Sequence, residues 1–224
     1  DRGGRGRQNR NCEETDVRQK QANIAVLVSG GGTNLQAILD AEARGEIPDG
    51  EVVMAVSDRS GAYALTRAEK AGIRALEISK KACGGQAAFE KNLIAALTEN
   101  RIDLIVLAGF LSILTEDFTE LYSRRIINVH PSLIPSFCGA GFYGLRVHQA
   151  ALARGVKVTG ATVHFVNGIP DGGEIIAQKA VEILPGDTPE RLQRRVMEEA
   201  EWILLPKAVE MVSRDIVSGA RQGF

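Results

Sequence analysis

The sequence predicts an α/β protein with a doubly wound, mainly parallel sheet and an antiparallel strand pair toward the C-terminus. Up to residue 130, short apolar runs alternate with stretches of helical periodicity at a regular pitch, as in chains of β-α-β units. The first of these runs is continuous, which is typical of a strand covered by helices on both faces. After residue 156, two strand-like runs are separated by a short turn that favours antiparallel pairing.

The alternation defines the first part of the chain element by element. We expect five strands, at residues 23–29, 51–57, 74–79, 103–108 and 125–129. We expect helices between them, at residues 33–44, 63–71 and 87–97. The first helix has Leu35, Ile38 and Leu39 on one face, so it presents an apolar side to the sheet.

The second part of the chain has a different pattern of elements. Its expected elements are a loop rich in proline and glycine at residues 131–143, a helix at 146–154, and strands at 157–166 and 174–184. Thr188 is a suitable N-cap for a final long helix, which we expect to reach about residue 214 with an interruption at Pro206.

The composition is that of an ordinary soluble globular protein, with 44% hydrophobic and 25% charged residues among 224. The net charge of −1 argues against a general polyanion-binding surface. Three cysteines without CxxC spacing and three histidines without metal-ligand spacing argue against a disulfide framework and a metal site. No apolar run approaches the ~20 residues of a membrane span. We therefore expect a cytoplasmic protein, monomeric or homodimeric, that binds neither membranes nor nucleic acid.

Residues 1–22 differ from the rest of the chain, because Val17 is their only large aliphatic residue. Such a segment buries too little apolar area to offset the entropy of ordering it. We expect a disordered tail at residues 1–22, followed by a single domain over residues 23–224. An RNA-binding arm is the alternative for the tail, since four arginines cluster there with glycines.

Residues 29–34, Ser-Gly-Gly-Gly-Thr-Asn, connect the first expected strand to the first helix. Glycines allow close backbone approach, and a helix N-terminus offers free N–H groups to an anion. The dinucleotide fingerprint fails because Leu35 occupies its third glycine position, and the P-loop fails because no Gly-Lys-Ser/Thr follows. The segment is either a generic phosphate site or a tight strand-to-helix turn without a ligand.

A second polar segment, Asn128-Val129-His130, lies at the carboxyl end of an expected strand, where open α/β sheets bind ligands. Strand alternation places Asn128 and His130 on the same side. An amide beside an imidazole suits a developing oxyanion and a proton transfer, although a structural histidine is the simpler alternative. Asp171, in a glycine-flanked turn, matters only if the fold brings it to His130, which spacing alone cannot show.

Four segments together resemble the folate-dependent phosphoribosylglycinamide formyltransferases of purine biosynthesis. They are SGGGTNLQAILDA, LAGFLSIL, INVHPSLIPSF, and GATVHFV with the DGG that follows it. The resemblance covers residues 23 to about 212 and implies the formyltransferase fold. It also implies that 10-formyltetrahydrofolate is the co-substrate and that its formyl group passes to the amine of phosphoribosylglycinamide.

The resemblance implies a catalytic set of Asn128, His130 and Asp171. By the family's scheme the amine attacks the formyl carbon directly, Asn128 and His130 stabilise the oxyanion, and His130 moves the proton. Asp171 holds the imidazole charged and oriented, so we expect a raised pKa for His130. His164 is expected to support this set.

The resemblance also implies the binding residues. The backbone of Gly32, Thr33 and Asn34 holds the ribonucleotide phosphate, and Glu201 contacts the glycinamide. The residues assigned to the folate pocket are Gln86, Leu111, Ser112, Ile113, Leu114 and Asn128, with the loop that ends at Asp171. Gln86 and Ser112 stand where the family commonly has arginines, and no metal is expected.

Three alternatives remain open. A formyltetrahydrofolate deformylase uses a similar residue set but carries an N-terminal regulatory domain, which 22 polar residues cannot form. A methionyl-tRNA formyltransferase carries an additional C-terminal RNA-binding domain. A non-catalytic nucleotide-binding α/β protein is disfavoured by the presence of Asn128, His130 and Asp171 together.

Overall fold

The computed structural model describes residues 20–219. Seven strands form one sheet in the order β3-β2-β1-β4-β5-β6-β7. β1 to β5 pair in parallel, whereas β6 and β7 each pair antiparallel to the strand before them. The strands are Ala22–Val28, Gly50–Ser57, Arg74–Glu77, Leu104–Leu107, Ile126–His130, Val158–Phe165 and Ile175–Glu182. The predicted fold class is therefore confirmed.

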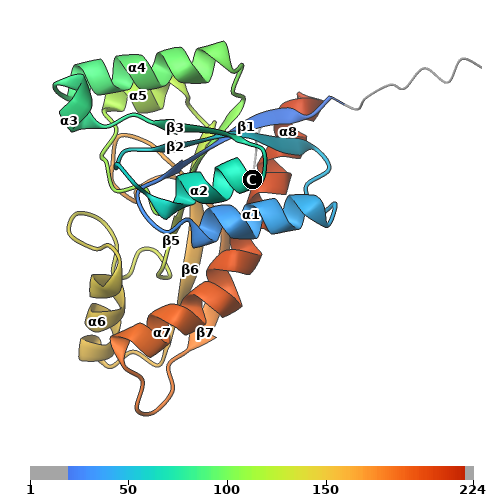
Figure 1. The fold of residues 1–224 in the computed structure, drawn as a ribbon. Coiled ribbons are helices and arrows are strands. Elements are labelled where there is room, and N and C mark those ends of the chain that lie inside the picture. Colours follow the sequence, from blue (N-terminus) through green and yellow to red (C-terminus); the bar gives the residue numbers. More distant parts are fainter. Residues whose placement is uncertain (1–19, 220–224) are drawn as a thin grey trace, which may run out of the picture.

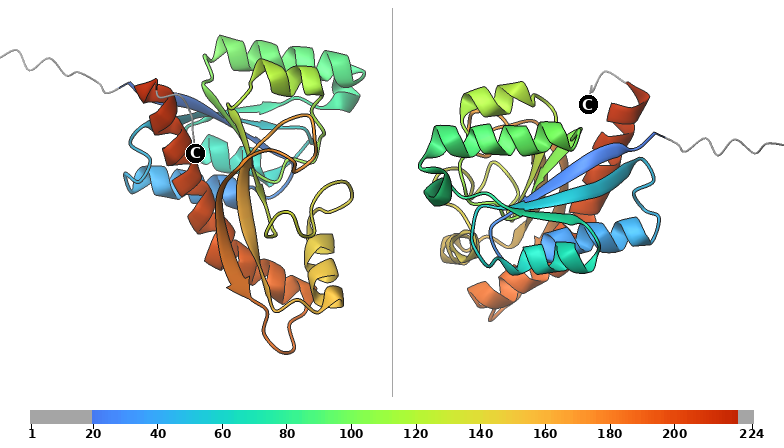
Figure 2. Two further views of the ribbon diagram at one scale, coloured as in Figure 1. Left: turned by 180° about the vertical axis from the view of Figure 1, so that it is seen from behind. Right: turned by 45° about the horizontal axis from the view of Figure 1, so that its top comes forward.

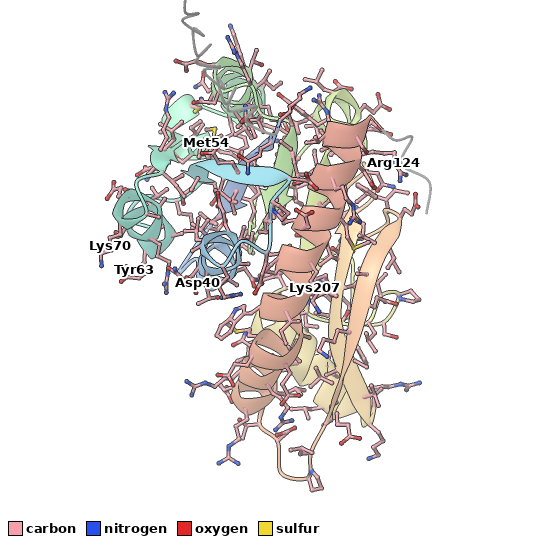
Figure 3. All side chains as sticks on the ribbon, turned by 90° about the vertical axis from the view of Figure 1, so that its right-hand side faces the viewer. Asp40, Met54, Tyr63, Lys70, Arg124 and Lys207 are labelled. Carbon is pink, nitrogen blue, oxygen red and sulfur yellow. The ribbon has the colours of Figure 1, made fainter. Side chains whose placement is uncertain are left out.

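Helices cover both faces of the sheet (Figure 1). One face carries α4 and α5, and the other carries α1, α2 and α8. Met54 of β2, labelled in Figure 3, lies in the apolar cluster that includes Phe89 of α4. The helices are α1 Thr33–Ala43, α2 Tyr63–Lys70, α3 Lys80–Cys83, α4 Gln86–Glu99, α5 Glu116–Leu121, α6 Leu145–Arg154, α7 Pro189–Val196 and α8 Trp202–Ser218.

The C-terminal helices pack across the sheet. Figure 2 shows α8 running diagonally over the molecule, from beside β6 and β7 to beside β1. In Figure 3, Lys207 marks α8 and Asp40 marks the neighbouring α1. α6 and α7 lie next to one another at the end of the molecule where β6 and β7 project (Figure 1). No helix among the described residues has the length and apolar composition to cross a membrane.

The structure differs from the sequence-based expectation at several elements. The short helices α3 and α5 were not predicted, and β1 begins at Ala22, whose N–H bonds to the carbonyl of Asp49. The final helix is interrupted by a π-helical segment at Met197–Glu201 and not at Pro206. Pro206 is buried inside α8, where packing offsets the one helical hydrogen bond that its missing N–H forfeits. The tail expected before the domain lies mostly outside the described residues.

Candidate active site

The register between β5 and β6 places two polar side chains opposite one another. Asn128 pairs with His164, and His130 pairs with Thr162. Nδ1 of His164 lies 2.8 Å from the carbonyl oxygen of Phe165, so this nitrogen carries the proton in the neutral ring. Nε2 of His164 then accepts a hydrogen bond from the Asn128 amide at 3.2 Å. The imidazole of His164 thus fixes which way the amide of Asn128 points.

Asp171 lies between the two histidines. Its Oδ2 is 3.5 Å from Nδ1 of His130, and its Oδ1 is 3.5 Å from Nε2 of His164. The backbone N–H of Gly139 donates to Oδ2 at 2.8 Å. Burial raises the pKa of Asp171, but the two histidines and the Gly139 N–H outweigh it, and the net pKa lies below its usual value. The fold therefore brings a carboxylate to His130.

His130 is buried and already engaged at its second nitrogen. Its Nε2 lies 2.9 Å from the carbonyl oxygen of Phe137, to which it donates in the neutral ring. Burial lowers the pKa of His130, and the charge of Asp171 offsets this only in part. The expectation of a raised pKa is therefore wrong, because burial was not visible in the sequence. The lowered pKa favours the neutral ring of His130, which is the form that can accept a proton.

An apolar cleft of about 150 Å³ opens beside these residues. Of the residues expected in a folate pocket, Ser112, Ile113, Leu114 and Asn128 line it, together with residues 166–171. Ile113 and Ile169 also line the cleft and are 73% and 66% exposed, as expected of side chains that contact a ligand.

Two of the residues expected in that pocket are held elsewhere. Leu111 does not line the cleft, and its N–H donates to Oγ of Ser29 at 2.8 Å. The amide of Gln86 donates to Glu90 at 2.7 Å and to the carbonyl of Ile113 at 3.1 Å. Gln86 therefore supports the wall of the cleft from behind.

The three glycines before α1 lie in different surroundings. Gly32 has a φ of 72° and precedes the helix without a side chain that could cap it. A Cβ on Gly32 would lie 2.6 Å from the Cβ of Ala64, so this glycine is required by packing against α2. A Cβ on Gly30 or Gly31 would meet nothing within 4 Å. The uncapped N–H groups of the first turn, at Thr33 and Asn34, are thus available to an anion.

Arg67 is a candidate site residue that the sequence reasoning missed. It is on α2, and its Nε donates to the carbonyl of Gly31 at 2.8 Å while Nη1 donates to Gln36 at 3.0 Å. A cleft of about 370 Å³ over α1 is lined by Thr33, Arg67 and Trp202, among others. The only signal for Arg67 in the sequence was the position of α2. This helix follows β2, which neighbours β1 in a sheet of this class, so its first turns lie near the loop after β1.

Glu201 reaches the same loop from the C-terminal region. It ends the π-helical segment, is 7% exposed, and accepts a hydrogen bond from Nδ2 of Asn34 at 2.8 Å. Burial raises its pKa. The structure therefore joins Glu201 to Asn34 at the start of α1, whereas the sequence separates them by 167 positions.

The candidate site lies at the carboxyl ends of β1, β4 and β5. The described residues 20–219 contain no group of three or more acidic, histidine or cysteine side chains arranged to hold a metal ion. On one side of this region lies the glycine loop, residues 29–34, with Arg67 and Glu201 beside it. On the other side lies the apolar cleft. Asn128, His164 and Asp171 line or border the cleft, and His130 lies directly behind them. The arrangement can hold an anionic substrate and an apolar one on either side of a proton acceptor.

The chain is similar to known proteins over most of its length. Residues 22–209 match the formyl transferase family. The chain is 38% identical over 187 residues to phosphoribosylglycinamide formyltransferase of Haemophilus influenzae, covering 85% of that protein. It is 39% identical to the chicken trifunctional purine biosynthetic protein adenosine-3, of which it spans 20%.

Solved structures agree with this result. Glycinamide ribonucleotide transformylase 1 from Symbiobacterium toebii superposes with a TM-score of 0.80 at 43% identity, over 87% of this chain and 88% of that one. The enzyme of the same name from Geobacillus kaustophilus gives a TM-score of 0.79 at 38% identity, over 86% of this chain and 98% of that one. The chain therefore belongs to the formyl transferase family, among the phosphoribosylglycinamide formyltransferases.

Proposed function

We propose that this chain transfers the formyl group of 10-formyltetrahydrofolate to the amine of phosphoribosylglycinamide, a step of purine biosynthesis. One observation carries the proposal: Asp171 joins His130 and His164 beside Asn128, between the uncapped start of α1 and an apolar cleft. The family relationship supports the same pair of substrates.

The acceptor side fits a phosphorylated amine. The phosphate would lie against the N–H groups that open α1, where the helix dipole and the guanidinium of Arg67 favour negative charge. Glu201 and Asn34 would then face the glycinamide end of the same molecule. Their side chains offer both hydrogen-bond donors and acceptors, which suits an amide.

The donor side fits a flat heterocycle with polar edges. Phe110, Ile113 and Ile169 contribute apolar surface to the cleft, and the backbone of residues 167–171 runs along one side of it. Backbone N–H and C=O groups in this loop can pair with the edges of a pterin. The same loop ends at Asp171, so binding of the donor and placement of the carboxylate depend on one segment.

The chemistry follows from the positions of the polar groups. The amine nitrogen of the acceptor forms a bond to the formyl carbon, and the formyl oxygen gains negative charge. The Asn128 amide has one N–H directed to His164, which leaves the other for this oxygen. His130, neutral at the start, takes a proton from the attacking nitrogen, and Asp171 stabilises the imidazolium that forms. The bond between the formyl carbon and N10 then breaks, and the proton is delivered to N10.

A single assay tests the proposal. The chain is incubated with 10-formyltetrahydrofolate, with and without phosphoribosylglycinamide, and tetrahydrofolate is measured together with the formylated ribonucleotide. The expected result is one equivalent of each product, formed only when the ribonucleotide is present. Formation of tetrahydrofolate and formate without the ribonucleotide would indicate a hydrolase and would refute the proposed transfer.

A further inference from the structure

One wall of the apolar cleft is a segment without regular structure, residues 110–114. Within the described part of the chain, no hydrogen bond joins its backbone to another backbone group. Its polar contacts instead go to side chains from other elements. Ser29 of the β1 end binds the N–H of Leu111, while Lys80 and Gln86 donate to the carbonyl of Ile113. The shape of this wall therefore depends on the side chains behind it.

Glu90 on α4 links these supports. Glu90 is only 9% exposed, and its carboxylate accepts three hydrogen bonds, each of 2.7 Å: from Nε2 of Gln86, from the N–H of Thr115 and from Oγ1 of Thr115. Through Gln86 it also fixes the donor to Ile113. Thr115 is the N-cap of α5, so its two hydrogen bonds to Glu90 lie where the wall ends and the helix begins.

We propose that Glu90 is a positioning residue for the formyl-donor pocket. It does not line the cleft, and it acts by holding residues 113–115 at the distance from Asn128 and residues 166–171 that the donor requires. A buried carboxylate with three donors is a rigid support, because losing the acceptor leaves all three donors unpaired. The proposal rests on the proposed function, since it assigns Glu90 to the donor half of that site.

Variants on both sides of the contact test it. Glu90→Gln removes the charge at nearly constant shape and places an amide N–H₂ among the donors. Thr115→Val removes the hydroxyl, and Thr115→Ser restores it. Glu99→Gln is the matched control, because Glu99 is an exposed acid at the other end of the same helix. The probes are tetrahydrofolate for calorimetry and 10-formyltetrahydrofolate, with saturating ribonucleotide, for steady-state rates.

We expect Glu90→Gln to raise the Kd for tetrahydrofolate and the KM for 10-formyltetrahydrofolate about tenfold or more, the usual cost of losing hydrogen bonds to a charged group. The Kd for the ribonucleotide and kcat should change less than threefold. Thr115→Val should behave like Glu90→Gln, and Thr115→Ser and Glu99→Gln like the parent chain. Hydrogen–deuterium exchange of residues 110–115 should accelerate in Glu90→Gln.

The outcomes separate this proposal from the proposed function. A parent chain that neither binds tetrahydrofolate nor transfers a formyl group would refute the function, while the exchange measurement would still decide whether Glu90 holds the wall. An unchanged exchange rate at residues 110–115 would overturn the positioning. So would a lower melting temperature with an unchanged Kd for tetrahydrofolate, because Glu90 would then only stabilise the fold.

Discussion

Replacing Asp171 by Asn tests the central electrostatic feature of the site. The backbone should tolerate the change, because residue 171 has a φ of 53° and Asn is one of the residues that adopt this conformation most readily. The Asn carbonyl can still accept the hydrogen bond from Gly139. What is removed is the negative charge 3.5 Å from Nδ1 of His130.

The size of the effect follows from that distance. At an effective dielectric of about 20, unit charges about 4 Å apart attract by about 4 kcal/mol, which corresponds to about three orders of magnitude in rate. Asp171 is only 15% exposed, so solvent screens this attraction weakly. We expect kcat to fall by about 10² to 10⁴. Phosphoribosylglycinamide affinity should change little, because the glycine loop does not contact Asp171.

The pH dependence gives a second, independent readout. Burial already lowers the pKa of His130 below its usual value, and losing Asp171 should lower it further. The acidic limb of the kcat/KM profile should therefore shift to lower pH, and an NMR titration of His130 should show the same shift. Asp117→Asn, at an exposed position of α5, is the control. Near-normal turnover with an unchanged His130 titration would remove Asp171 from the mechanism.

Three further predictions concern the acceptor loop and the buried histidine. Arg67→Gln should weaken ribonucleotide binding in calorimetry by about 10- to 100-fold and leave tetrahydrofolate binding unchanged. Lys70→Gln, on the same helix, should leave both affinities unchanged. Equal losses in both variants would contradict a specific contact. Gly32→Ala should lower the free energy of unfolding by about 1–3 kcal/mol, because the new Cβ would meet Ala64. Gly30→Ala should leave the free energy of unfolding unchanged. Equal effects of the two variants would refute the packing argument. His148, with a folded pKa of about 4, stays neutral where the unfolded chain binds a proton, so stability should fall by up to about 3 kcal/mol from pH 6.5 to 4. His148→Leu should lessen this fall in denaturation curves; the same slope in both proteins would exclude the group.

Features that depend on residues close together in the sequence could be predicted from it. Asn128 and His130 share a side of β5 because alternation along a strand is local. The glycine loop was recognisable because a strand, a glycine run and a helix follow one another within a few residues. The antiparallel pairing of β6 and β7 followed from the short turn between them.

The features that escaped prediction depend on tertiary structure. The distance from Asp171 to His130 is set by the turn after β6 and by the pairing of β6 with β5, neither of which spacing encodes. The lowered pKa of His130 reflects burial, which outweighs the nearby carboxylate. Gln86 was expected at the donor on the basis of its place in the family pattern, but Glu90 and Ile113 engage its amide. Arg67 had no motif to mark it.

Two buried polar atoms without partners lie near the proposed ribonucleotide site. Folded proteins pair nearly all their buried polar groups, so each unpaired group at a candidate site calls for an explanation. Oδ1 of Asn34 is buried without a partner although Nδ2 of the same side chain is bound to Glu201. Nε1 of Trp202, the next residue after Glu201, is also unpaired. Among residues 20–219, no donor satisfies this hydrogen-bond acceptor at the start of α1. The amide N–H of the proposed glycinamide substrate is a group of the right kind to satisfy it once the Asn34 side chain turns out of its buried position.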